Sequence, residues 1–169
     1  MFARPRIRME LSSADRLVEG IAICLLIFLW VIGFFAYRTL PATIPTHFDL
    51  RGQPDGFGNK LSILVLPGVG TLLFLTLTII NRFPHIFNYP VSITEGNAPK
   101  QYLLATRFIR YIKTMLLLLF NLLLGYTYAT AKGIHISMGK WIVPVTLACT
   151  LLPTLLFVIR SLSLSKKAS

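Results

Sequence analysis

Long runs of apolar residues, separated by polar segments, dominate the pattern of the chain. Four runs contain no Asp, Glu, Lys, Arg or His, and they occupy residues 20–37, 61–80, 114–131 and 141–159. Each run has 18 to 20 residues, which lets an α-helix cross a hydrocarbon core of about 30 Å at a rise of about 1.5 Å per residue. The pattern predicts an all-α membrane protein in which four transmembrane helices form a single membrane domain over residues 1–169.

The positive charge predicts which ends of these helices face the cytoplasm. The chain has 17 Lys and Arg against 6 Asp and Glu, a net charge of +11. Placing both termini and the loop 81–113 on one side puts twelve basic residues there and five on the other side. Because positive loops face the cytoplasm, we expect both termini inside and the connections 38–60 and 132–140 outside. Contact with the lipid bilayer and its anionic inner leaflet then accounts for the charge, and we expect no nucleic-acid partner.

The outer connection 38–60 has a regular sequence pattern that predicts local structure. Apolar and polar residues alternate over residues 44–51, which is the period of a half-buried β-strand. The sequence Gln-Pro-Asp-Gly at residues 53–56 then places Pro and Gly at positions typical of a type I turn. We therefore expect a short ordered strand-turn loop whose apolar face packs onto the outer ends of the helices. The residues of that face are Ile44, Phe48, Leu50 and Phe57.

Ionisable residues of this loop are the candidates for partner binding. His47, Asp49 and Arg51 recur at every second position, so a strand would present them on one face, about 7 Å apart. We interpret Asp49 as an ion-pair partner of its two neighbours, and Asp55 as a residue that holds the turn. A metal site is a weaker interpretation, because His47, Asp49 and Asp55 offer too few ligands unless His135 contributes. We predict no bound metal, no cofactor and no catalytic residue.

The segment before the third apolar run predicts a basic interfacial helix that starts near Ala98. Its positive residues lie along a slowly rotating stripe, and we interpret them as side chains that anchor the helix at the inner membrane surface. They are Lys100, Arg107, Arg110 and Lys113. The spans themselves contain no Asp, Glu, Lys, Arg or His, and we expect their two cysteines, Cys24 and Cys149, to be buried. That absence argues against an ion-coupled carrier, and it favours an interhelical hydrogen bond for Asn121.

The outer loop also resembles a known family. The resemblance rests on Leu40-Pro41, Ile44-Pro45, His47-Phe48, Gly52, Pro54-Asp55-Gly56, Gly58 and Lys60, which are similar to the hallmark of the bacterial membrane proteins grouped as domain of unknown function 1648. A second stretch, from Asn88 to Arg110, resembles small four-span members of that group. The resemblance implies a multi-pass protein of the bacterial cytoplasmic (inner) membrane. Some relatives with this loop are SdpI-type immunity and signalling proteins.

Three functional hypotheses follow from these features. The first is a non-enzymatic membrane protein that binds a partner, as a sensing or immunity-like protein or as an accessory subunit, with another protein or a second copy of itself as the partner. The second is a small transport or channel component. The third is a metal-dependent enzyme that uses the histidine and aspartates of the outer loop.

Overall fold

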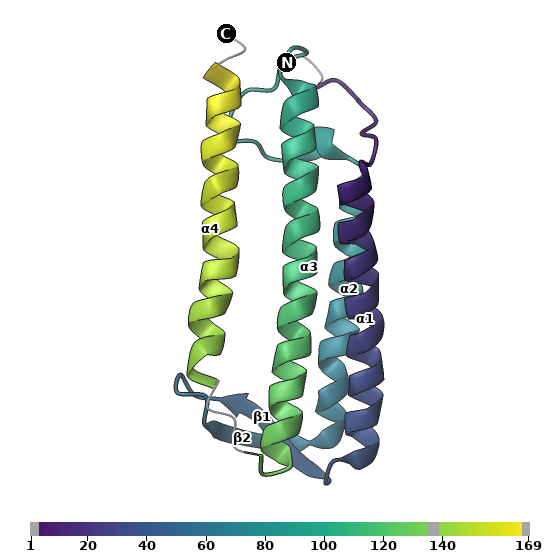
Figure 1. Cartoon of the computed structure of the whole chain (residues 1–169), viewed down its shortest axis with the longest axis vertical. Coiled ribbons are helices and arrows are strands. Elements are labelled where there is room, and N and C mark those ends of the chain that lie inside the picture. Colours follow the sequence, from purple (N-terminus) through teal and green to yellow (C-terminus); the bar gives the residue numbers. More distant parts are fainter. Residues whose placement is uncertain (1–3, 135–138, 167–169) are drawn as a thin grey trace.

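Four long helices stand side by side in the computed structural model, which describes residues 4–134 and 139–166 (Figure 1). They are α1 (Ser13–Thr39), α2 (Val65–Ile80), α3 (Ala98–Ala131) and α4 (Gly139–Lys166). A 3-10 turn, η1 (Lys60–Leu64), leads into α2, and another, η2 (Pro84–Ile86), follows it. Four segments, namely α1, η1 together with α2, α3 and most of α4, are long and apolar enough to span a membrane, which confirms the predicted multi-pass architecture.

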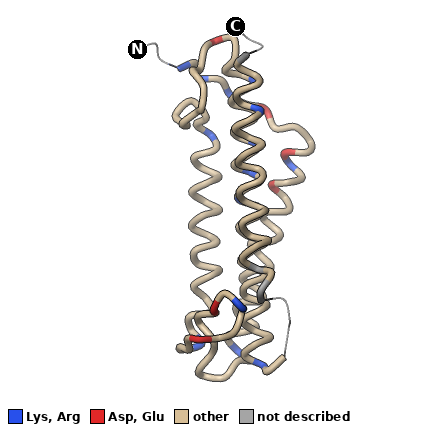
Figure 2. The backbone as a smooth tube through the Cα atoms, turned by 90° about the vertical axis from the view of Figure 1, so that its left-hand side faces the viewer, with Lys and Arg blue, Asp and Glu red and all other residues tan. Residues whose placement is uncertain are grey.

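The two ends of the bundle differ. Both described ends of the chain lie at one end, here called the termini end, together with the connection from α2 to α3 (Figure 1). A two-stranded sheet between α1 and α2 lies across the opposite end, here called the hairpin end. Acidic and basic residues gather toward these two ends, and the middle of the bundle is free of them over the described residues (Figure 2). This arrangement agrees with a protein that crosses a membrane four times.

Side-chain caps mark the starts of two helices. Ser12 and Asp15 form a capping box at the start of α1, in which the Asp15 carboxylate accepts a hydrogen bond from the Ser12 backbone at 3.0 Å and the Ser12 hydroxyl accepts one from Asp15 N–H at 3.2 Å. Asn59 caps η1 by accepting a hydrogen bond from Leu61 N–H at 2.8 Å. Such caps satisfy backbone N–H groups that have no partner within the helix.

The core is formed mainly by α1, α2 and α3, while α4 packs chiefly against α3. Gly33 of α1 permits close approach of α2, because a Cβ there would lie 2.9 Å from Pro67 Cγ. Asn121 Nδ2 of α3 donates to the Leu25 carbonyl of α1 at 3.0 Å, which confirms the predicted interhelical hydrogen bond. The expected burial of Cys24 is wrong, because Cys24 lies on the outward surface of α1.

Candidate functional site

The loop between α1 and α2 is a β-hairpin. Strand β1 (Thr43–Phe48) pairs with β2 (Pro54–Asn59) in antiparallel orientation. The strands are joined by a tight turn in which Asp49 N–H donates to the Gln53 carbonyl and Gly52 N–H donates to the Asp49 carbonyl, both at 2.9 Å. Period-two alternation thus predicted the first strand, but the strand ends at Phe48, so Asp49 and Arg51 lie in the turn and do not share a strand face with His47. The second strand was not predicted.

The turn predicted at residues 53–56 is wrong, because the chain reverses earlier. Asp49 Oδ1 accepts hydrogen bonds from the backbone N–H groups of Arg51 and Gln53, at 2.8 and 2.7 Å. Gly52 adopts a φ of 77°, in the left-handed region that favours glycine. These two features close the hairpin before the Pro-Asp-Gly sequence, which lies in β2 instead. Proline is tolerated there because it is the first residue of an edge strand.

Two glycines of β2 leave room for the side chains of β1. A Cβ at Gly56 would lie 3.0 Å from His47 Cβ, and one at Gly58 would lie 3.0 Å from Thr46 Cγ2. The pairing is irregular here, because Pro45 and His47 oppose consecutive residues of β2. Gly56 has no positive φ, so its role is to make space, whereas a role in the turn would have required the left-handed conformation.

One side of the hairpin is fixed to the helices. Ile44 is fully buried in the core, and the Phe48 ring lies 5.0 Å from the Tyr126 ring of α3. Tyr126 Oη also donates to the Gly52 carbonyl at 2.6 Å, which ties the turn to α3. The expected packing of Leu50 and Phe57 is wrong: they are 84% and 63% exposed, because Leu50 lies in the turn and Phe57 on the outward side of β2.

The opposite side of the hairpin carries an exposed ion pair. His47 Nδ1 lies 2.5 Å from Asp55 Oδ1, and the two side chains are 72% and 47% exposed. The predicted roles of the two aspartates are therefore exchanged: Asp55 pairs with His47, and Asp49 holds the turn. Arg51 is exposed in the turn. An exposed pair of this kind contributes little to stability.

A metal site in this loop would need a ligand from outside the described residues. Within residues 4–134 and 139–166, no three His, Cys, Asp or Glu side chains lie close enough together to hold a metal ion. His135, the extra ligand that such a site would need, lies outside the described residues. The expectation of no bound metal therefore stays a prediction.

A second concentration of charge lies between α1 and α3 near the termini end, and the sequence pattern did not predict it. Lys113 Nζ lies 2.6 Å from Glu19 Oε2 and donates to Thr78 Oγ1 of α2 at 2.9 Å. Arg110 lies between the two acidic residues of α1, with Nη1 3.6 Å from Asp15 Oδ1 and Nε 3.3 Å from Glu19 Oε1. We call the set Asp15, Glu19, Arg107, Arg110 and Lys113 the charged cluster.

The charged cluster corrects the interpretation of the basic stripe as surface anchors. The side chains of Arg110 and Lys113 are only 8% and 1% exposed, because they turn inward to the carboxylates of α1. Arg107 is half-exposed and lies 3.1 Å from Asp15 Oδ1, and Lys100 is exposed. Two of the four residues can therefore reach the membrane surface, and the other two stabilise the contact between α1 and α3.

The N-terminal segment, residues 4–11, crosses the termini end as a strap. The Arg4 guanidinium donates to the carbonyl groups of His85 and Phe87 and lies 5.7 Å from the centre of the Tyr89 ring. Tyr102 Oη of α3 donates to the Pro5 carbonyl at 3.1 Å. Burial raises the pKa of Tyr89 well above its usual range, so its hydroxyl keeps the proton that it donates to a nearby backbone carbonyl.

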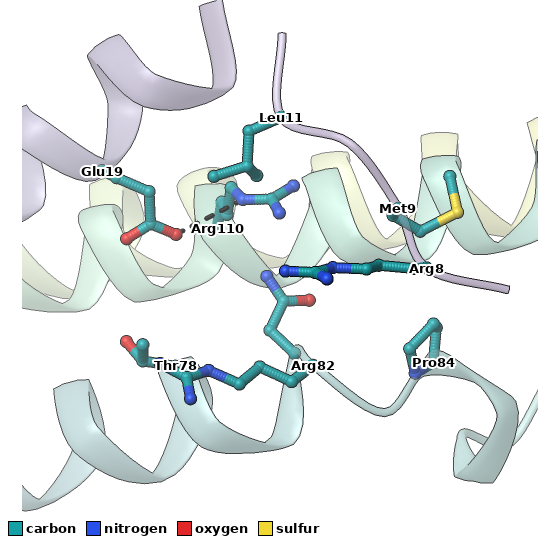
Figure 3. Close-up of a pocket in the computed structure, with 9 residues that line it drawn as sticks. Arg8, Met9, Leu11, Glu19, Thr78, Arg82, Pro84 and Arg110 are labelled. Atoms are coloured by element: carbon teal, nitrogen blue, oxygen red, sulfur yellow. Dashed lines mark ion pairs between the residues drawn. The ribbon is translucent and has the colours of Figure 1, made fainter. Parts of the chain in front are cut away.

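A pocket of about 550 Å³ lies beneath this strap. Its polar lining comes from the strap, from α1, from the end of α2 and the residues after it, and from α3 (Figure 3). The polar residues are Arg8, Glu19, Thr78, Asn81, Arg82 and Arg110. In Figure 3 the guanidinium groups of Arg8 and Arg110 point into the same space. The pocket therefore presents a predominantly positive lining next to the charged cluster.

Comparisons with known proteins find a family match over the hairpin and the helices on either side of it. Residues 24–71 match the family described as a domain of unknown function, DUF1648. An uncharacterized protein of Archaeoglobus fulgidus is 33% identical over 112 residues, which cover 60% of this chain and 61% of that relative. No solved structure matches the chain. The match to the DUF1648 family begins within α1, includes the whole hairpin and ends within α2.

Proposed function

We propose that this protein is a non-enzymatic subunit of the bacterial cytoplasmic membrane that recognises a protein partner through the outward side of its hairpin. The proposed role is a sensing, immunity-like or accessory one. The partner is either another protein or a second copy of the chain. The observation that carries the proposal is the division of the hairpin into one side fixed to the helices and one side left exposed.

The size and order of the hairpin support a recognition role. A connection between two antiparallel helices needs only a few residues, yet a pair of strands with a specified turn stands between α1 and η1. Ordered surface loops held on a rigid scaffold are common positions for binding residues. The hydrogen bond from Tyr126 to the turn and the burial of Ile44 hold this loop to the helices.

The exposed side has the composition of a binding surface. Phe57 and Leu50 are large apolar side chains in contact with solvent, close in sequence to the His47–Asp55 ion pair and to Arg51. Aromatic and Arg side chains are enriched among the residues that dominate binding energy, and apolar anchors are usually surrounded by polar groups. This mixture suits a protein surface better than it suits lipid, because two charged groups lie on the same side.

The distribution of basic residues supports an outward-facing hairpin. By sequence, twelve of the Lys and Arg residues lie in the segments 1–19, 81–113 and 160–169, and five lie in the segments 38–60 and 132–140. The positive-inside rule then directs the termini end to the cytoplasm. In that orientation the hairpin meets partners outside the cell or in the periplasm.

Site-specific photo-crosslinking in cells tests this function. A photoreactive residue at Phe57 is expected to give a discrete adduct, and the same residue at Phe28, on the outward surface of α1, serves as a matched apolar control. Replacing both His47 and Asp55 by Ala should weaken the Phe57 adduct at unchanged protein level. The mass of the adduct separates a second copy of the chain from another protein. Absence of any adduct from both Phe57 and Leu50 would contradict the proposal.

A further inference from the structure

The pocket beneath the N-terminal strap has an excess of positive charge that the protein does not use internally. Together with the charged cluster, its surroundings contain five basic side chains, Arg8, Arg82, Arg107, Arg110 and Lys113, against the two carboxylates of Asp15 and Glu19. Both carboxylates are already engaged by basic groups of α3. The pocket therefore attracts an anion, although one carboxylate lines it.

Two of the guanidinium groups are available for a ligand. Arg8 and Arg82 are exposed, and neither has an ion pair or side-chain hydrogen bond within residues 4–134 and 139–166. Arg110, by contrast, is buried and held by Asp15 and Glu19, so it supplies a fixed positive charge at the base of the pocket. Guanidinium groups bind phosphate oxygens in pairs of parallel hydrogen bonds, which favours a phosphate over a halide ion.

Asn81 adds an unused acceptor to this positive pocket. Its Nδ2 donates to the Thr106 carbonyl of α3 at 3.2 Å, which fixes the orientation of the amide. Its Oδ1 is buried and accepts no hydrogen bond in the described part of the chain. A buried acceptor without a donor is costly, and a ligand hydroxyl or N–H group relieves that cost. The ligand should therefore carry a donor beside its negative charge.

The pocket also lies at the level where phosphate groups are found. Glu19 directly precedes the apolar run of α1, and Asn81 and Arg82 directly follow that of α2. These positions place the pocket at the boundary between the hydrocarbon core and the polar surface of the leaflet. Basic pockets between helices on the cytoplasmic side are typical binding positions for anionic lipid head groups.

We propose that this pocket binds a phosphate ester that carries a hydroxyl group, as in the head group of phosphatidylglycerol or in soluble glycerol phosphate. Arg8 and Arg82 bind the phosphate oxygens from the strap and from the segment after α2. Arg110 supplies the fixed positive charge, and Asn81 Oδ1 accepts a hydrogen bond from the ligand hydroxyl. The site is separate from the hairpin surface, so a test of anion binding in this pocket does not depend on partner recognition by the hairpin.

Native mass spectrometry of the full chain in detergent, with lipids titrated in, tests the site. We expect saturable binding of phosphatidylglycerol and at least tenfold weaker binding by the variant Arg8→Gln/Arg82→Gln. Arg6→Gln is the matched control, because Arg6 is an exposed residue of the same strap that does not line the pocket, and it should bind like the parent protein. Melting temperatures without lipid should agree among the three proteins, since neither pocket arginine has an internal partner.

Two further comparisons identify the ligand chemistry. Phosphatidylethanol has the same charge but no head-group hydroxyl, and it should bind several-fold more weakly than phosphatidylglycerol if Asn81 accepts a hydrogen bond. Glycerol phosphate that binds with the same sensitivity to the double variant would support a soluble source of the phosphate ester. The proposal is overturned if Arg6→Gln weakens anion binding as much as the double variant does, because binding would then follow net charge alone. It is also overturned if neither the lipid nor glycerol phosphate binds saturably.

Discussion

The two ends of the bundle use the same chemical groups for opposite purposes. At the hairpin end, His47 and Asp55 pair in contact with solvent, on a loop whose position depends on backbone hydrogen bonds and on apolar side chains. At the termini end, Lys113 and Glu19 pair between two helices, and the lysine is almost completely buried. An exposed ion pair contributes little to the free energy of unfolding, whereas removing one member of a buried pair leaves an uncompensated buried charge. The comparison indicates that the charged cluster is structural and that the hairpin pair is free to serve recognition.

The largest expected effect comes from removing an acidic residue of the charged cluster. Glu19→Gln leaves Lys113 buried without a carboxylate, with only Thr78 and the Phe74 ring in contact with its ammonium group, and takes one of two carboxylates from Arg110. We expect the free energy of unfolding to fall by about 3 kcal/mol, as for other broken buried pairs. Thermal unfolding in a mild detergent measures this loss. The double variant Glu19→Gln/Lys113→Met should recover part of it, and a single variant as stable as the parent would contradict a structural role.

An intermediate effect is expected in the turn of the hairpin. Gly52→Val places a β-branched residue at a φ of 77°, which should cost about 1–2 kcal/mol. It should also weaken the contact with Tyr126, whose hydroxyl donates to the Gly52 carbonyl. Gly20→Ala is the control, since a Cβ at that position in α1 meets nothing within 4 Å and should leave stability unchanged or slightly raised. Equal melting temperatures for the two variants would show that the turn contributes nothing to the fold.

The smallest expected effect on stability comes from the exposed ion pair. His47→Ala should lower the free energy of unfolding by less than about 1 kcal/mol, because both side chains of the pair are in contact with solvent. The same substitution should reduce crosslinking from position 57. A large loss of stability together with unchanged crosslinking would reverse the comparison and make the pair structural.

Features set by neighbouring residues could be predicted from the sequence. The four spans follow from the length of the apolar runs, and the start of α1 follows from the Ser12 and Asp15 capping box. Strand β1 follows from its alternation, but the reversal was misplaced because both Asp49-to-Gly52 and Gln53-to-Gly56 carry turn residues. Which segment turns depends on tertiary contacts, namely the bond from Tyr126 and the space that Gly56 leaves for His47.

The charged cluster could not be predicted from local pattern. Lys113 and Glu19 are 94 residues apart in the sequence, and their pairing depends on the packing of α3 against α1. A usable signal was nevertheless present: Asp15 and Glu19 are four residues apart at the edge of an apolar run, and Arg110 and Lys113 are three apart at the edge of another. Such spacings place both members of each pair on one helix face, and opposite charges on two faces at one membrane depth suggest an interhelical pair.

Both the hairpin and the pocket were assigned to a side of the membrane, and this orientation of the bundle is the central claim of the account. Thiol labelling tests it most directly. In a background with Cys24 and Cys149 replaced by Ala, single cysteines replace Gln53 in the hairpin and Glu95 at the termini end, both exposed positions. A membrane-impermeant maleimide added to intact cells should label Gln53→Cys, whereas Glu95→Cys should react only after the membrane is opened. Labelling of Glu95→Cys but not of Gln53→Cys on intact cells would invert the topology and contradict the account.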